Sequence, residues 1–138
     1  GFLNEKGRCS IHPYRPGFCR MFPLGRIYED GGFRYFLQVH ECPFPGKTKV
    51  KLKKWLGIPE IGRYERYVCD WHFFLKDMQK IIRETENEEI TRNLNLYLLN
   101  QFYVQTYETS RADGKEADFY GQFYMRLEEA KKRAALYA

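Results

Sequence analysis

The strongest hydrophobic pattern in the chain lies between residues 59 and 82. Apolar side chains recur there at steps of three and four residues, the spacing that places them on one face of a helix. The residues on this face are Tyr64, Tyr67, Val68, Trp71, Phe74, Leu75, Met78, Ile81 and Ile82. The pattern therefore predicts a long amphipathic helix whose apolar face belongs to a core.

Two further helices are predicted downstream. The first begins after Asn87, a typical N-cap residue that precedes two glutamates, and its apolar positions continue to Phe102. Gly114 interrupts the pattern within residues 111–118. From Phe119 onward, apolar residues recur at steps of four, and they predict a third helix that closes the chain.

The first third of the chain is rich in Gly and Pro and shows little helical periodicity. Two short runs, Arg26–Glu29 and Phe33–Val39, have the composition of strands. They flank the sequence Asp30-Gly31-Gly32, whose residues are typical of tight turns. This arrangement predicts a β-hairpin.

Residues 48–57 favour a short helix that ends at Gly57, although the alternation at its start would also suit a strand. Together the elements predict an α+β fold that is mainly α. We expect a single domain over residues 1–138, because this length suits one core better than two. In it, an irregular Cys- and Pro-rich part with the hairpin, residues 1–48, packs on the two or three long helices of residues 49–138.

The composition is that of a globular protein, with 43% hydrophobic and 30% charged residues. No window approaches the ~18 apolar residues of a membrane span, and no signal region begins the chain. We therefore expect no membrane partner and a cytoplasmic location. The chain opens with GFLNEKGRC, without an initiator Met, from which we expect a fragment or a processed product.

The formal net charge is +5, and one run of positive residues contains no acid. Five lysines fall within eight residues: Lys47, Lys49, Lys51, Lys53 and Lys54. Beside Trp55, this run is a candidate anion-binding surface, so a nucleic-acid or polyanion-binding domain is one alternative function. The ordinary explanation is a solvated face, and most aromatic residues of the chain fall at core spacing.

Cysteine and histidine supply the candidate metal chemistry. The cysteines are Cys9, Cys19, Cys42 and Cys69, and the histidines are His12, His40 and His72. Three of the cysteines have a histidine within three positions, and Cys69 and His72 would share a face of the predicted helix. Thiolates with imidazole suit zinc, and thiolates alone suit an iron–sulfur cluster. The alternative is buried free thiols and ordinary polar histidines; no C-x-x-C knuckle is present, and nothing indicates the oxidising compartment that disulfides need.

Residues 9–25, CSIHPYRPGFCRMFPLG, combine two of these cysteines with three prolines. Pro13, Pro16 and Pro23 limit any helix to a turn or two, and they stiffen the loop that would bring the two thiols together. Three aromatic residues are expected to pack this loop rather than contact a ligand: Phe18, Phe22 and Phe36.

Arg15 and Arg20 lie in the same loop. Hydrogen bonds from their side chains to backbone carbonyls would explain them, and so would compensation of the negative charge of a multi-thiolate site. An ion pair with Glu29 or Glu41 is the alternative.

The run GRCSIHPYRPGFCRMFPLG, followed by HECP, resembles the zinc- or iron-chelating domain family that is named for its CxxCxxxCC motif. Within roughly residues 1–45, the matching positions are Cys9, His12, Arg15-Pro16, Cys19-Arg20, Phe22-Pro23 and Cys42. The resemblance implies a zinc or iron–sulfur site, whose ligands would be Cys9, Cys19, Cys42 and Cys69, with His12 or His72 as substitutes. The supporting motif residues would be Arg15, Pro16, Arg20 and Pro23.

The CxxCxxxCC cluster itself is not in this sequence and would lie upstream of Gly1. A missing N-terminal segment of the same protein is therefore a candidate partner. The flagellin lysine methylases look like relatives, in which this cysteine pattern is associated with an iron–sulfur cluster, and the helical remainder looks like the tail of a longer bacterial member. No S-adenosylmethionine-binding glycine motif is recognisable, so the resemblance implies a metal site more than methyl transfer.

We therefore predict a metal-binding module of unknown physiological role. A part of a lysine-methylating or redox enzyme is a further alternative beside the polyanion-binding domain. No Ser-His-Asp set, pair of catalytic carboxylates or phosphate loop is recognisable, although Cys19 beside Arg20 would also suit a reactive thiol.

Overall fold

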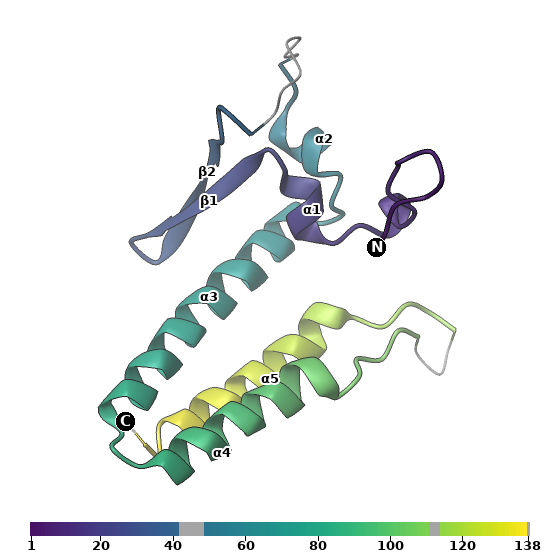
Figure 1. The fold of residues 1–138 in the computed structure, drawn as a ribbon. Helices are drawn as coiled ribbons and strands as arrows, with labels where there is room; N and C mark the ends of the chain where they lie inside the picture. Colours follow the sequence, from purple (N-terminus) through teal and green to yellow (C-terminus); the bar gives the residue numbers. More distant parts are fainter. Residues whose placement is uncertain (42–48, 111–113, 138) are drawn as a thin grey trace. The chain divides into compact units, whose positions relative to one another are not determined.

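The computed structural model describes residues 1–41, 49–110 and 114–137 (Figure 1). Helices and one two-stranded antiparallel sheet make up the regular structure of these residues. This confirms an α+β fold that is mainly α. No helix in the described ranges is long and apolar enough to cross a bilayer.

By their internal contacts, the residues form two compact units, Gly1–Glu65 and Arg66–Ala138. The boundary falls inside the long helix α3, Ile61–Glu84, which was predicted from its apolar face. The sequence predicts a change of character after residue 48, where the Gly- and Pro-rich part ends. The single domain over residues 1–138 stays a prediction.

The predicted hairpin is confirmed. Strand β1, Leu24–Glu29, pairs antiparallel with β2, Gly32–Leu37. Gly32 pairs with Glu29 instead of lying in the turn, so the loop consists of Asp30 and Gly31. Both loop residues have positive φ, +51° and +74°, as a two-residue hairpin loop of type I′ requires.

The proline-rich segment contains only short helices, as predicted. The 3₁₀ turn η1, His12–Tyr14, is followed by α1, Gly17–Met21, and Pro16 is the N-cap of α1. Helix α2, Leu52–Leu56, ends at Gly57, whose φ of +58° is the left-handed conformation that glycine adopts at low cost. The helix favoured for residues 48–57 is therefore present, and the strand is not.

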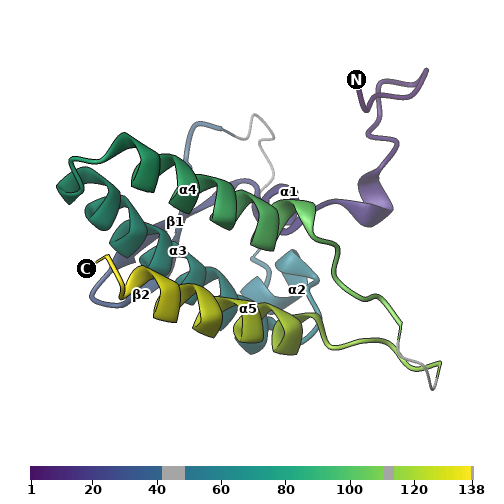
Figure 2. The ribbon, with the colours of Figure 1, turned by 90° about the horizontal axis from the view of Figure 1, so that it is seen from below.

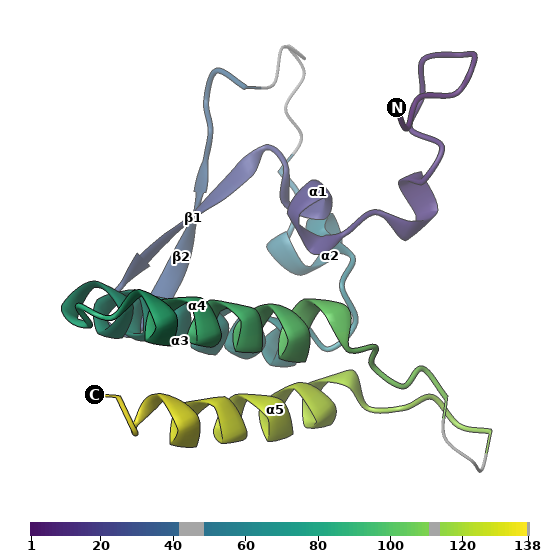
Figure 3. The same cartoon turned by 60° about the horizontal axis from the view of Figure 1, so that its bottom comes forward.

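The unit Arg66–Ala138 is built from the greater part of α3 together with α4, Glu88–Leu99, and α5, Phe119–Ala134. Figures 2 and 3 show the three helices side by side. Asn87 caps α4 as predicted: its Oδ1 accepts hydrogen bonds from the backbone N–H groups of Glu89 at 2.9 Å and Ile90 at 3.2 Å.

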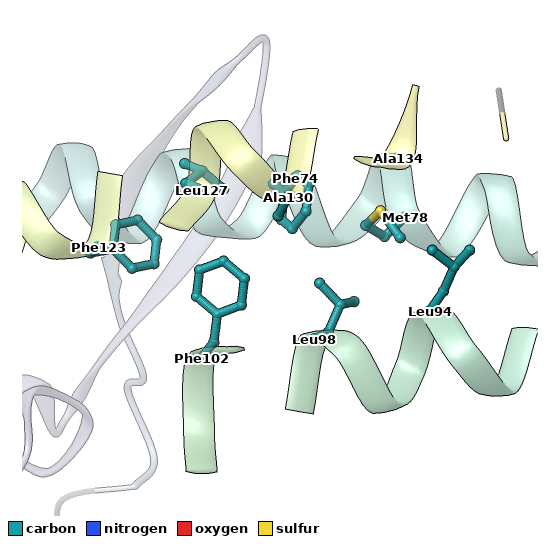
Figure 4. Close-up of a cluster of buried hydrophobic side chains, with 9 residues drawn as sticks. All are labelled: Phe74, Met78, Leu94, Leu98, Phe102, Phe123, Leu127, Ala130 and Ala134. Atoms are coloured by element: carbon teal, nitrogen blue, oxygen red, sulfur yellow. The ribbon is translucent and has the colours of Figure 1, made fainter. Parts of the chain in front are cut away.

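The core of this unit draws on all three helices (Figure 4). Its buried side chains are Phe74, Met78, Leu94, Leu98, Phe102, Phe123, Leu127, Ala130 and Ala134. Leu127 is fully buried, and Trp71 packs its ring 4.5 Å from that of Phe102. Of the residues predicted to stack at steps of four in the closing helix, Phe123 and Leu127 are buried, whereas Phe119 lies at the rim with 36% of its surface exposed.

The predicted second helix does not continue regularly to Phe102. After Leu99 it widens into the π-helix η2, Asn100–Val104. The Arg126 side chain donates hydrogen bonds to the carbonyls of Gln101 at 2.6 Å, Gln105 at 2.9 Å and Thr106 at 2.7 Å. Gln101 lies within η2, Gln105 is its C-cap residue and Thr106 follows it, so Arg126 holds both the end of η2 and the segment after it.

Candidate functional site

Cys9 lies on a hydrogen-bonded loop at the start of the chain. Its backbone forms an isolated antiparallel bridge with Leu3. The Asn4 side chain accepts hydrogen bonds from the backbone N–H groups of Lys6 at 3.1 Å and Arg8 at 3.0 Å, which fixes the loop between them. The Cys9 thiol is free and exposed. The loop is thus held by polar contacts and not by burial of its cysteine.

Cys19 lies on α1, and its thiol is also free and exposed. The neighbouring Arg20 folds back over the loop and donates hydrogen bonds to the carbonyls of Arg15 at 3.0 Å, Gly57 at 3.3 Å and Pro13 at 3.4 Å. This confirms the predicted hydrogen bonds from the Arg20 side chain to backbone carbonyls. Glu29, one of the two predicted acidic partners, instead pairs with Arg34 at 2.7 Å.

His12 and Arg15, two further residues of the motif, contact each other. Nη1 of Arg15 lies 3.1 Å from Nε2 of His12. Because a guanidinium can only donate, Nε2 accepts in this contact and the proton of the neutral ring sits on Nδ1. A metal bound through His12 would therefore have to displace Arg15 or change the tautomer. The two exposed cysteines of this unit carry no such restriction.

Cys69 and His72 lie on α3 within the unit Arg66–Ala138, and both are half-buried. Burial raises the pKa of the Cys69 thiol, and the negative charge of Asp70 raises it further. Burial and the charge of Lys76 lower the pKa of His72. The environment thus favours a neutral imidazole, which binds metals, and a neutral thiol, which does not.

The predicted ligand set is only partly described. Cys42 lies outside the described residues, and His40 beside it is exposed. Among residues 1–41, 49–110 and 114–137, no three His, Cys, Asp or Glu side chains come close enough together to hold one metal ion. The set Cys9, Cys19, Cys42 and Cys69, with His12 or His72, therefore stays a prediction.

The alternative explanation for the cysteines is that they are buried packing residues. Free cysteine is among the residue types most often buried in folded proteins. Cys9 and Cys19 are both exposed, so their side chains contribute little to a core. Packing therefore does not account for these two residues, whereas Cys69, half-buried on α3, still fits that explanation.

Phe18, Phe22 and Phe36 were expected to pack the loop. For Phe18 and Phe22 this is wrong, because 78% and 49% of their surfaces are exposed. All three residues line a cavity of about 370 Å³. The ring of Phe36 packs over Gly25. A Cβ atom at position 25 would collide with this ring, so the ring can lie there only because Gly25 has no side chain.

Sequence reasoning also missed the surroundings of Arg26 on β1. Its Nη2 donates a hydrogen bond to the Tyr64 hydroxyl at 2.6 Å, and its guanidinium lies 5.3 Å from the ring centre of Phe33 and 5.8 Å from that of Tyr35. Burial alone would lower the pKa of Arg26, but its contacts with Tyr28 and Tyr64 outweigh that effect and raise the pKa. Arg26 and Tyr35 face each other in the register, a pairing that the predicted hairpin could have indicated.

The basic run is exposed where the structure describes it. The described lysines are Lys49, Lys51, Lys53 and Lys54, and Lys47 lies outside the described residues. Lys53 and Lys54 occupy the last turn of α2, where positive side chains favour the helix dipole. Nε1 of Trp55 donates a hydrogen bond to the Phe22 carbonyl at 3.1 Å, which ties α2 to the end of the proline-rich loop.

The resemblance to the CxxCxxxCC family, which rests on the motif residues within roughly residues 1–45, stays a prediction. No protein-family model, no curated protein and no solved structure matches the chain significantly.

Proposed function

We propose that this chain is a metal-binding module in which Cys9 and Cys19, together with Cys42, supply thiolate ligands to zinc or to an iron–sulfur cluster. The observation that carries the proposal is the exposure of two free thiols, one on a loop and one on the short helix α1, in a segment that hydrogen bonds and prolines hold in place. Free cysteines in a folded protein are usually buried, so two exposed ones in one motif indicate a chemical role.

The donor chemistry of this unit fits such a metal. Thiolate is the ligand shared by structural zinc sites and iron–sulfur clusters. Arg20, next to Cys19 in sequence, holds this segment in place through hydrogen bonds to the carbonyls of Arg15 and Pro13. Bound zinc would fix the loops to one another, and a bound cluster would supply electron transfer.

Cys69, His72 and His12 are secondary candidates in this proposal. A half-buried thiol with a raised pKa binds metal less readily than an exposed one, and Cys69 has such a thiol. His12 already uses Nε2 in its contact with Arg15. We therefore assign the main ligand role to the cysteines of the unit Gly1–Glu65.

The free thiols also support the predicted cytoplasmic location, because a reducing compartment preserves them. A role as part of a lysine-methylating or redox enzyme is a wider proposal that rests on the family resemblance alone.

The proposal is tested with serine variants of single cysteines. Cys19→Ser and Cys9→Ser should each lower the metal-to-protein ratio of anaerobically purified protein, because a hydroxyl is a poor ligand for zinc and for iron–sulfur clusters. Far-UV circular dichroism should remain that of the parent, since both side chains are exposed.

Cys69→Ser is the matched control, because it makes the same chemical change in the other unit. It should leave the metal content unchanged. An equal loss in all three variants would assign Cys69 to the site, and an unchanged ratio in Cys9→Ser and Cys19→Ser would refute the proposal.

A further inference from the structure

The positive charge of the chain belongs to one of its two units. Residues Gly1–Glu65 contain twelve Lys and Arg against six Asp and Glu, a formal charge of +6. Residues Arg66–Ala138 contain eleven basic and twelve acidic residues, a formal charge of −1. Such an asymmetry is typical of a unit that faces a polyanion.

The lysines of the basic run differ from three other lysines of the chain in whether they form ion pairs with carboxylates. Lys80, Lys131 and Lys132 each lie within 4.0 Å of a glutamate on the same helix. None of the lysines at positions 49, 51, 53 and 54 forms an ion pair with a described residue, and all four are exposed. Their charge is therefore not compensated within the described chain.

An ordered aromatic residue lies within the same short stretch. Trp55 has 44% of its surface exposed, and the hydrogen bond from its Nε1 to the Phe22 carbonyl holds the indole in a fixed orientation. A surface that binds single-stranded nucleic acid has two parts. Cations lie along the phosphate backbone, and an aromatic ring beside them stacks on a base. Helix α2 has only five residues, which is too short to read base edges along a duplex groove.

From these observations we propose that the α2 surface, defined by Lys49, Lys51, Lys53, Lys54 and Trp55, binds single-stranded nucleic acid through its phosphates, with a base stacked on Trp55. The contact needs no particular sequence, because phosphates and base faces are common to all nucleotides. RNA and DNA share this chemistry, and the binding assay distinguishes them.

The test uses the full chain and fluorescently labelled oligouridylate and oligothymidylate, followed by anisotropy over a range of salt concentrations. The variant Lys51→Gln/Lys53→Gln/Lys54→Gln should bind about tenfold or more weakly at low salt, and the slope of log affinity against log salt should fall by about 2. The matched control, Lys80→Gln/Lys131→Gln/Lys132→Gln, removes the same charge from lysines that have carboxylate partners. It should change the affinity by less than about threefold.

Equal losses in the two triple variants would show that only net charge matters, and they would overturn the assignment to α2. Tighter binding to a duplex of the same length, or to phosphatidylserine vesicles, would also overturn it. The metal content of the α2 variant should stay that of the parent, so this proposal and the metal proposal fail independently.

Stacking is tested by fluorescence. The chain has two tryptophans, so Trp71→Phe leaves Trp55 as the single reporter. Oligouridylate should quench its emission, whereas polyphosphate, a polyanion that carries no base, should not. Unchanged emission on binding of oligouridylate, in this variant and in the parent chain, would refute the stacked base.

Discussion

The Arg20 guanidinium donates a hydrogen bond to the carbonyl of Gly57, 37 positions away in the chain, at 3.3 Å. This contact joins α1, the short helix that carries Cys19, to the C-terminal end of α2. The same side chain holds the carbonyls of Pro13 and Arg15. Arg20 therefore holds the segment between Pro13 and Cys19 in its fold and also connects this segment to α2.

Arg20→Gln should lower the free energy of unfolding by about 1–3 kcal/mol, because three carbonyls lose a charged donor. Urea denaturation followed by circular dichroism measures this. Arg34→Gln is the control: it breaks an exposed ion pair with Glu29 and should cost less than about 1 kcal/mol. Equal effects would contradict the role given to Arg20.

Arg126→Gln should lower the free energy of unfolding by about 2–3 kcal/mol, because it removes the donors for three carbonyls around η2. The control is Arg133→Gln, which removes a contact between the guanidinium and the Tyr97 ring at 4.5 Å and should cost about 1 kcal/mol or less. Chemical denaturation of both variants gives the comparison. A smaller loss for Arg126→Gln than for Arg133→Gln would contradict the prediction.

Leu127→Ala should destabilise the protein by about 2–5 kcal/mol, since Leu127 is fully buried and its removal leaves a cavity among the three helices. Met125→Ala on the same helix should change stability by less than about 0.5 kcal/mol, because 76% of Met125 is exposed. The midpoints of urea unfolding test the pair, and similar values for both variants would mean that α5 packs through another face.

The raised pKa of Tyr35 predicts that the stability of the protein falls at alkaline pH. Burial raises the pKa of Tyr35 from 10.0 to about 12, with Glu65 adding to the shift and Arg26 opposing it. Because the folded protein holds this proton more tightly, the contribution of Tyr35 to stability is complete below pH 10 and is lost as the pH rises to about 12. Unfolding measured between pH 9 and pH 12 should show a shallower decline in Tyr35→Phe than in the parent; parallel declines would contradict the shift.

The sequence was sufficient for the elements that local patterns determine. The apolar face of α3, the Asn87 cap and the hairpin turn all depend on neighbouring residues, and all three were predicted, although the turn was expected to include Gly32, which belongs to β2. The π-helix after Leu99 was not, because it is accompanied by hydrogen bonds from Arg126 on another helix.

The candidate site also has features that local sequence predicts and features that depend on the fold. The motif marks Cys9 and Cys19, whereas their exposure and the hydrogen bond from Arg20 to Gly57 depend on how the chain folds. The exposure of Phe18 was also unpredictable, since an aromatic residue in a loop normally indicates packing.

The most direct test of the metal proposal is elemental analysis, together with an absorption spectrum, of the parent chain purified without oxygen. We predict stoichiometric zinc without colour, or iron with a broad absorption band near ~400 nm, bound through thiolates of Cys9 and Cys19. A protein that is folded by circular dichroism but contains neither metal, and that takes up neither from solution, would contradict the proposed function.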